Sequence, residues 1–408
     1  MRRFKMMTRT FIRLAAYNLK MLCRLAVSAI ALSIFPIAAS AQVKPEEVYP
    51  DPLKFLFWSP QEKPVGFRNI DKIFPGHVVK RGVHVAPLPY AARELAVRYQ
   101  YKGEAWDTAR FMEHNNVAGL LVIHDGKILM ERYALGFDQN SRWTSFSVAK
   151  SFTSTLAGAA IADGAIKSID DPVTRYLPGL KGSAYDGVTV RHVLNMSSGV
   201  KWNEDYVDPH SDVNSFSQAT DESKGSRLTT YMAKLPREAE PGTKFVYKTG
   251  ETNLIGEIII GAVKKPLAAY LSEKVWSKVG MERDAFWITS PDEREIGGCC
   301  LSISLRDYGR FAMFFLSGAK GVVAADWTKQ ATTPTPFSTD PRGGYGYQWW
   351  TGPNETFFAS GIFGQHIQFF PAEKVIVVTL SAWPTALDGA RRDARGAYLQ
   401  AVRDAILH

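Results

Sequence analysis

Cysteine is scarce in this chain, with three residues among 408. Cys23 lies near the N-terminus, and the other two, Cys299 and Cys300, are adjacent. A secreted protein held together by disulfides would contain more cysteine pairs, and separated ones, so a disulfide scaffold is excluded. The adjacent pair allows a strained vicinal disulfide or two buried small apolar side chains. We expect the second.

Several catalytic and cofactor signatures are also absent. The eight histidines show no His-Glu-x-x-His or other metal-ligand spacing, and no Gly-x-Ser-x-Gly elbow is present. No glycine-rich phosphate loop follows a predicted strand. The sequence therefore implies no metal, no cofactor and no nucleotide. His366 is interpreted as a core or rim histidine, with a place near the active site as the alternative.

Acidic residues are missing from the first 41 positions, which hold seven of the 49 Lys and Arg residues. An uncharged apolar run covers residues 25–39, and Ala39-Ser40-Ala41 precedes Gln42. This order is typical of a secretory signal peptide. We expect residues 1–41 to be removed and the mature protein to be periplasmic or secreted. An uncleaved anchor is the alternative, and the possible translation starts include Met6, Met7 and Met21.

The remaining chain, residues 42–408, is nearly neutral, because removing seven of the 49 basic residues leaves 42 against 40 acidic ones. This balance argues against a nucleic-acid or membrane-surface partner. No later apolar run is long enough to span a bilayer, so no stable membrane span is expected after signal cleavage. The length suits one large domain with two lobes. The sequence gives no oligomeric state.

The most informative feature that is present is Ser147-Val-Ala-Lys150. It begins a small-residue, apolar segment, residues 147–164, with no charged side chain between Lys150 and Asp163. On the helix that this segment predicts, positions three apart share a face, so the Lys150 amine can reach the Ser147 hydroxyl. Burial would lower the pKa of the lysine and free it to act as a base. Ser147 is then a candidate nucleophile.

The same short pattern occurs again at Ser198-Gly-Val-Lys201. This copy lies in a Ser-Ser-Gly turn and no helical segment follows it. We interpret it as a chance match, because short motifs have many false positives.

The pattern of elements predicts an α+β fold. Residues 92–114 suggest a helix, and two β-rich runs around Asp125-Gly126 indicate a hairpin. Residues 42–90 look like an irregular N-terminal wrap, and roughly 165–290 form a helical, loop-rich lobe. Strands return in the C-terminal third before a final helix, and their expected ranges are 345–350, 357–361, 366–370 and 374–381. Together these elements imply an antiparallel sheet with helices on its faces and a second helical lobe.

Ordered blocks along the chain resemble the serine hydrolases related to class C β-lactamases. The blocks are residues 147–152, 163–178, 191–199, 240–247, 254–256, 301–311 and 361–365. Within that group the chain looks most like the 6-aminohexanoate-oligomer hydrolases and their carboxylesterase relatives. The resemblance implies a β-lactamase/penicillin-binding-protein-like fold with the active site between the sheet and the helical lobe.

The resemblance also implies roles for individual residues. Ser147 would be the nucleophile, Lys150 its base, and Tyr247 the tyrosine that passes a proton to the leaving group. The oxyanion would be bound by the backbone N–H groups of Ser147 and Ile362, the residue after Gly361. Gly361 and Tyr206 would contact the substrate, Tyr206 on its leaving-group side.

Two departures from the family pattern bear on specificity. The family's Tyr-x-Asn is Tyr247-Lys248-Thr249 here, and Ala359-Ser360-Gly361 stands where the lactamases have a Lys-Thr-Gly strand. In the family, that lysine helps to hold the carboxylate of a β-lactam. The literal Lys248-Thr249-Gly250 is interpreted as a decoy, because no β-rich run leads into it.

The sequence therefore predicts an exported serine hydrolase that acts on a small ester or linear amide. One alternative is a β-lactamase or D-alanyl-D-alanine carboxypeptidase with the same nucleophile. The other is a non-catalytic receptor of penicillin-binding-protein type. The joint presence of Ser147, Lys150 and Tyr247 argues against a receptor, which needs no proton relay.

Overall fold

The computed structural model describes residues 47–339 and 343–408. The predicted signal peptide, residues 1–41, lies outside the described residues. No helix in the described part of the chain is long and apolar enough to cross a membrane.

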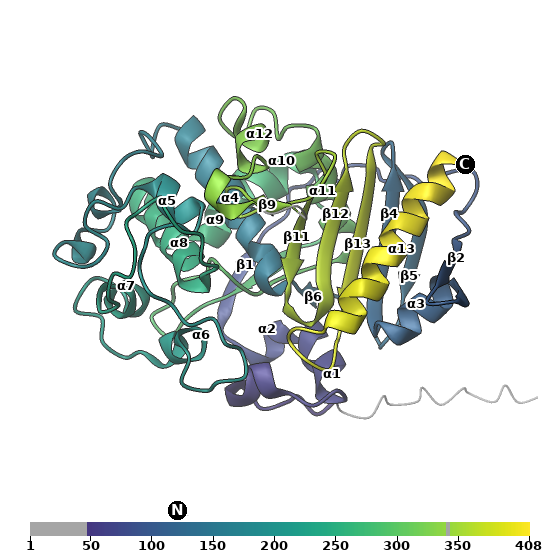
Figure 1. Cartoon of the computed structure of the whole chain (residues 1–408), viewed down its shortest axis with the longest axis horizontal. Coiled ribbons are helices and arrows are strands. Elements are labelled where there is room, and N and C mark those ends of the chain that lie inside the picture. Colours follow the sequence, from purple (N-terminus) through teal and green to yellow (C-terminus); the bar gives the residue numbers. More distant parts are fainter. Residues whose placement is uncertain (1–46, 340–342) are drawn as a thin grey trace, which may run out of the picture. The chain divides into compact units, whose positions relative to one another are not determined.

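The central element is an antiparallel sheet of seven strands in the order β5-β4-β13-β12-β11-β10-β9 (Figure 1). The strand bounds are β4 Val117–His124, β5 Lys127–Tyr133, β9 Gly344–Tyr345, β10 Trp350–Thr351, β11 Phe357–Gly361, β12 Gln365–Phe370 and β13 Val375–Ser381. The predicted hairpin around Asp125-Gly126 is confirmed, with φ of 45° and 77° at its two turn residues. The predicted single strand at 345–350 is wrong, because Gln348 has a φ of 64° and the chain turns there between β9 and β10.

A smaller sheet, which the sequence pattern did not predict, has the antiparallel order β1-β7-β8-β6. Its strands are β1 Gly76–Val79, β6 Trp143–Thr144, β7 Ala285–Ile288 and β8 Leu301–Ile303. Strand β6 runs directly into the segment that carries Ser147, so this sheet anchors the start of that segment.

The helix predicted at residues 92–114 is largely wrong. The chain instead forms a hairpin of β2 Arg98–Tyr101 and β3 Glu104–Asp107, and only α3 Thr108–His114 is helical. The turn residues Lys102 and Gly103 have φ of 53° and 81°, which suits a two-residue hairpin turn. Tyr101 and Trp106 pack edge to face with ring centroids 4.9 Å apart, so an aromatic cross-strand contact stabilises the hairpin.

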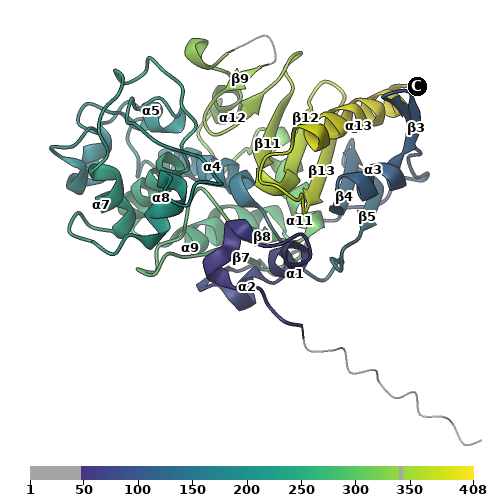
Figure 2. The ribbon, with the colours of Figure 1, turned by 60° about the horizontal axis from the view of Figure 1, so that its bottom comes forward.

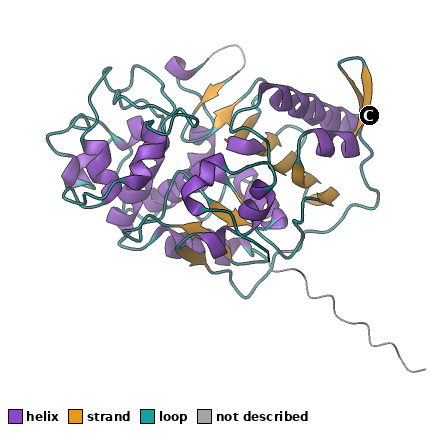
Figure 3. Ribbon diagram, turned by 90° about the horizontal axis from the view of Figure 1, so that it is seen from below, coloured by secondary structure: helices purple, strands orange, loops and turns teal. Residues whose placement is uncertain are grey.

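Helices cover both faces of the seven-stranded sheet. The C-terminal helix α13 Gly389–Leu407 lies along one face with α3, over a small apolar core (Figures 1 and 3). The other face packs against α11 Leu305–Leu316 within the main core, which also contains α4 Ala149–Ala162 and α8 Thr249–Val263. This arrangement confirms the α+β class, with helices flanking an antiparallel sheet.

A group of helices and loops forms a lobe beside the sheet (Figure 2). The members are η3 Val173–Arg175, η4 Pro178–Leu180, α5 Val190–Leu194, α6 Asp212–Ser215, η5 Phe216–Gln218, α7 Arg227–Ala233 and α8. The next elements, α9 Leu267–Leu271, η6 Ser272–Trp276 and α10 Ser277–Val279, lead from α8 back to the small sheet, where α9 contacts β1. The short elements α12 Trp327–Ala331, η7 Pro336–Ser338 and η8 Ile362–Gly364 lie later in the chain.

The N-terminal region is more regular than the sequence suggested. It contains η1 Pro52–Phe57, α1 Glu62–Arg68 and α2 Ile70–Ile73 before strand β1. The aromatic side chains explain this regular structure. Trp58 and Phe67 are at most 2% exposed and pack into the main core, which fixes the backbone that carries them. Much of the segment is therefore packed structure, and no helix or strand covers residues 80–89.

Candidate active site

Ser147 lies in η2 Phe146–Val148, the short turn that leads into α4. Its side chain is partly exposed, whereas Lys150, at the first turn of α4, is 1% exposed. The Lys150 Nζ atom lies 3.0 Å from Ser147 Oγ. Helix α4 is almost wholly buried, so its surroundings fix the position of this pair.

Two further acceptors surround the Lys150 amine. Its Nζ lies 3.0 Å from Thr249 Oγ1 and 2.8 Å from the carbonyl oxygen of Gly298. Burial lowers the pKa of Lys150 to about 8, and the opposing charge of Glu204 limits the decrease. A neutral amine has two N–H groups and one lone pair. If the N–H groups bind Thr249 and Gly298, the lone pair is left for the Ser147 hydroxyl.

Tyr247 lies two residues before the start of α8 and is half-buried. The Lys150 Nζ atom is 5.2 Å from the centroid of its ring, and the ring stacks on Trp350 with centroids 5.6 Å apart. Burial and the charge of Glu204 raise the pKa of Tyr247, while hydrogen bonding with Ser147 opposes this rise. The phenol therefore stays protonated near neutral pH and has a proton to give.

Glu204 is a site residue to which the sequence analysis assigned no role. It accepts hydrogen bonds from the Thr249 backbone N–H at 2.9 Å, from the Thr249 hydroxyl, and from the Trp202 indole. The Tyr206 hydroxyl donates to the same carboxylate at 2.8 Å. Glu204 thus joins the loop that carries Tyr206 to the start of α8.

The end of β11 passes very close to the nucleophile. A Cβ atom on Gly361 would lie 2.7 Å from the Ser145 carbonyl oxygen and 3.0 Å from the Ser147 backbone nitrogen. Only glycine allows this approach without a shift of the backbone. Ile362 is the next residue, at the start of η8. The two N–H groups predicted to bind the oxyanion, those of Ser147 and Ile362, therefore belong to two segments that contact each other.

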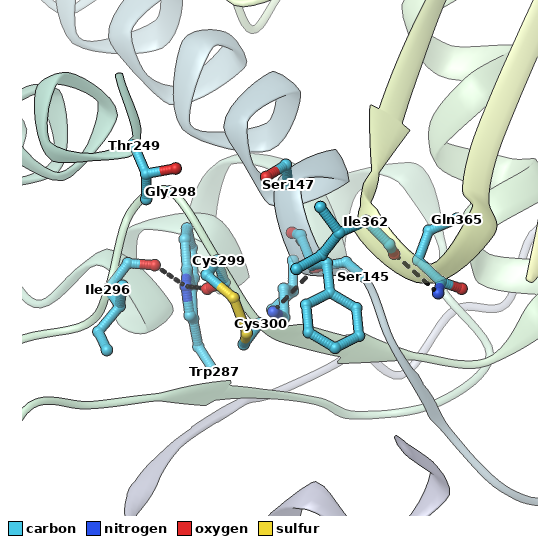
Figure 4. Close-up of a disulfide and its surroundings, with 12 residues drawn as sticks. Ser145, Ser147, Thr249, Trp287, Ile296, Gly298, Cys299, Cys300, Ile362 and Gln365 are labelled. Carbon is cyan, nitrogen blue, oxygen red and sulfur yellow. Dashed lines mark hydrogen bonds between the residues drawn. A yellow bond between two sulfur atoms is a disulfide. The ribbon is translucent and has the colours of Figure 1, made fainter. Parts of the chain in front are cut away.

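Cys299 and Cys300 form a disulfide beside Gly298 (Figure 4). The expectation that they are two separate apolar side chains is therefore wrong. The Trp287 indole donates to the Cys299 carbonyl at 3.2 Å, and Asn253 Oδ1 accepts from the Gly298 N–H at 2.7 Å. The disulfide turn thus carries the carbonyl that binds Lys150.

The second Ser-x-x-Lys copy is not a site. Ser198 is buried and donates to Glu251, while Lys201 is exposed and no helix follows it.

Lys248, the middle residue of the tyrosine motif, is paired with a residue other than Ser147. Its side chain is 1% exposed and its Nζ lies 3.5 Å from Glu251 Oε1. Lys248 therefore cannot replace the missing strand lysine, and Ala359, at that position in β11, is 1% exposed and uncharged.

His366 is a buried residue of β12, and its Nε2 lies 3.2 Å from Gln368 Oε1. Its core interpretation is therefore confirmed. Within residues 47–339 and 343–408, no group of three His, Cys, Asp or Glu side chains could hold a metal ion.

Sequence reasoning missed three contributors to the Lys150 environment: Glu204, Thr249 and Gly298. Thr249 was set aside with the decoy motif Lys248-Thr249-Gly250; the motif is indeed helical rather than a strand, but the threonine itself binds the lysine. The available signal was the family's Tyr-x-Asn motif, whose last position Thr249 occupies. A hydroxyl there can still accept from an amine.

Comparisons with known proteins agree with this fold. A sequence profile described as β-lactamase matches residues 108–401. The chain is 31% identical over 343 residues to the 6-aminohexanoate-dimer hydrolase of Paenarthrobacter ureafaciens, covering 78% of this chain and 85% of that protein. It is 27% identical over 180 residues to a β-lactamase of Pseudomonas fluorescens, covering 42% of this chain and 46% of the relative.

Solved structures share the fold. A provisionally assigned 6-aminohexanoate-dimer hydrolase from Bacillus anthracis superposes with a TM-score of 0.74 at 21% identity, covering 84% of this chain and 94% of that chain. A penicillin-binding protein from Bacillus halodurans gives a TM-score of 0.58 at 17% identity, covering 72% and 99%.

Proposed function

Because the chain belongs to the β-lactamase family, we propose that it is a serine hydrolase that cleaves esters or linear amides through an acyl-enzyme on Ser147. The observation that carries the proposal is the buried Lys150 amine, 3.0 Å from Ser147 Oγ. Acyl transfer needs a nucleophile, a base, an acid for the leaving group and donors for the oxyanion. The residues around Ser147 supply candidates for all four.

In the proposed acylation, Ser147 Oγ attacks the carbonyl carbon and its proton passes to the neutral Lys150 amine. The carbonyl oxygen becomes an oxyanion, which the N–H groups of Ser147 and Ile362 bind. When the bond to the leaving group breaks, the Tyr247 hydroxyl donates a proton to the departing alkoxide or amine, and the proton on Lys150 restores the phenol. Water then attacks the acyl-enzyme with the same groups in reverse roles and releases the carboxylic acid.

Charge near the nucleophile supports esters and linear amides over β-lactams. A β-lactam carries a carboxylate beside its reactive ring, but Ala359 offers no charge and Lys248 is buried against Glu251. A missing charge-assisted hydrogen bond is worth about 1.5–3 kcal/mol, or about 10- to 150-fold in rate. The likeness to the Paenarthrobacter ureafaciens hydrolase, whose name denotes a linear amide substrate, supports the same preference.

The test compares kcat/KM for nitrophenyl butyrate, a 6-aminohexanoate dimer and a chromogenic cephalosporin on one preparation. We expect the ester or the linear amide to exceed the cephalosporin by at least about 10-fold. A cephalosporin that is hydrolysed faster than both would favour the β-lactamase alternative. Absence of turnover on all three, with no labelling by a fluorophosphonate, would favour the receptor.

We also propose that the enzyme works in the periplasm or outside the cell. The basic residues, the apolar run at 25–39 and the Ala39-Ser40-Ala41 site support export. The disulfide between Cys299 and Cys300 also suits an oxidising compartment.

A further inference from the structure

The two backbone donors proposed for the oxyanion are each next to a phenylalanine in an unusual conformation. Phe146 precedes Ser147 with a φ of 42°, and Phe363 follows Ile362 with a φ of 58°. Bulky residues rarely adopt the left-handed region, and they keep it only where their surroundings hold them there. Both side chains are 1% exposed. What packs against these two rings therefore decides where the donors point.

The two rings pack against each other and against a third ring from the N-terminal region. The ring centroids of Phe146 and Phe363 are 5.2 Å apart. Phe67, in α1, lies 4.9 Å from the first ring and 5.5 Å from the second. The three phenylalanines form a closed triangle, with Phe67 as the member that neither donor segment supplies.

Further contacts hold the triangle in place. Phe55 stacks on Phe146 with centroids 5.2 Å apart. Lys63, also in α1, donates to the Pro384 carbonyl at 2.7 Å, and its Nζ lies 5.0 Å from the centroid of the Phe363 ring. Helix α1 is thus fixed to the segment after β13 and to the Phe363 side of the triangle.

We propose that Phe67, supported by Phe55, is a positioning residue that keeps the backbone N–H groups of Ser147 and Ile362 directed at one point. This inference rests on the proposed function and deepens it. It gives the N-terminal region, which lies outside residues 108–401 matched by the family, a part in the chemistry. Phe67 touches no reacting atom and acts only through Phe146 and Phe363.

Preorganised donors are effective because they need no reorientation while charge develops on the oxygen. Removing the Phe67 ring leaves a cavity beside Phe146 and Phe363, two residues whose backbone is held in the left-handed region. Both segments can then turn toward ordinary φ values, which changes the direction of the two N–H groups. Misplacement of such groups by about 1 Å can cost about 10²-fold in rate.

The test uses the full mature protein with Phe67→Ala, Phe67→Leu and Phe55→Ala. Phe111→Ala is the matched control, because Phe111 is also 0% exposed and stacks on Tyr398 at 3.9 Å in the separate core under α13. Each variant is assayed for kcat and KM on a nitrophenyl ester and on the matching thionoester, in which sulfur replaces the carbonyl oxygen. Sulfur accepts hydrogen bonds weakly, so the thionoester depends less on the two donors.

We expect Phe67→Ala to lower kcat on the ester by about 10- to 100-fold with little change in KM. The ester-to-thionoester ratio should fall, Phe67→Leu should recover part of the loss, and Phe111→Ala should leave the ratio unchanged. If Phe67→Ala does not fold, the half-buried Phe55 provides the test, and its alanine variant should show the smaller change in the same direction. A folded variant whose ester-to-thionoester ratio equals that of the wild type would overturn the inference.

Labelling of Ser147 by a fluorophosphonate is measured separately on the wild type. If the wild type is not labelled, the proposed function itself is refuted, and not the positioning role alone.

Discussion

Glu204 accepts hydrogen bonds from both the backbone N–H and the hydroxyl of Thr249. The same hydroxyl lies 3.0 Å from Lys150 Nζ, so one carboxylate fixes the acceptor that orients the proposed base. Its negative charge also favours the protonated amine, against the effect of burial. The pKa of Lys150 is therefore a balance between two identifiable causes, and each can be changed.

The pH dependence of the wild-type enzyme should follow the neutral fraction of Lys150. Since burial lowers its pKa to about 8, the base is mostly protonated below that pH and mostly neutral above it. We expect kcat/KM for a neutral ester to fall about tenfold per pH unit below the midpoint and to level off above it. The measurement is the kcat/KM profile between pH 5 and about 10, and a rate that declines on the alkaline side of pH 8 would show that the protonated amine is needed.

Glu204→Gln should move this midpoint to lower pH. The substitution removes the negative charge that raises the pKa of Lys150, so the amine loses its proton more easily. The absolute rate should also drop, because the two Thr249 donors bind different oxygens of Glu204 and the amide keeps only one oxygen. Asp205→Asn, an exposed neighbour on the same loop, is the control and should leave the midpoint in place. A shift to higher pH in Glu204→Gln would contradict this account.

Lys150→Arg tests whether the lysine works as a base. Arginine keeps the positive charge but does not lose its proton in proteins. We expect turnover to fall by about 10²-fold or more, close to the effect of Lys150→Ala. Lys201→Arg changes the lysine of the second Ser-x-x-Lys copy, which is exposed, and should have no effect. Near-wild-type turnover in Lys150→Arg would mean that charge alone is required.

Gly361→Ala tests the close approach of β11 to the nucleophile. The added Cβ atom would lie 3.0 Å from the Ser147 nitrogen and 2.7 Å from the Ser145 carbonyl oxygen. Displacing these groups should lower kcat/KM by about 10²-fold, the order of the loss of one oxyanion donor. Gly396→Ala in α13 is the control, because no atom lies within 4 Å of its added Cβ. Equal activities of the two variants would show that the close approach of Gly361 to Ser147 is not needed for catalysis.

Export predicts the N-terminus of the mature protein. If residues 1–41 are a cleaved signal peptide, N-terminal sequencing of the exported form should begin at Gln42. Full-length chain starting near Met1 in the membrane fraction would instead support the uncleaved anchor.

The sequence predicted those parts of the molecule that local patterns determine. The Asp125-Gly126 hairpin and the small-residue helix after Ser147 depend on turn chemistry and on helical spacing, and both are present in the structure. The helix predicted over 92–114 failed because the Lys102-Gly103 turn outweighed a weak helical pattern. Turn residues and helical spacing predict structure only where residues close in sequence also contact each other in the fold.

The partners of Lys150 could not be read in this way. Thr249 is 99 positions away and Gly298 is 148 positions away, and neither carries a local signal for binding an amine. The contact of Phe67 with Phe146 and Phe363 likewise depends on how three distant segments meet. Tertiary packing alone places these groups together, so the sequence identified the nucleophile and its base but not the shell around them.

The most direct test of the account is the site of covalent labelling. The mature protein is treated with a fluorophosphonate, digested, and the modified peptide is identified by mass spectrometry in the wild type and in Ser147→Ala and Ser198→Ala. The account predicts one label per chain on Ser147, lost in Ser147→Ala and retained in Ser198→Ala. A label on any other residue, or labelling that persists in Ser147→Ala, would contradict it.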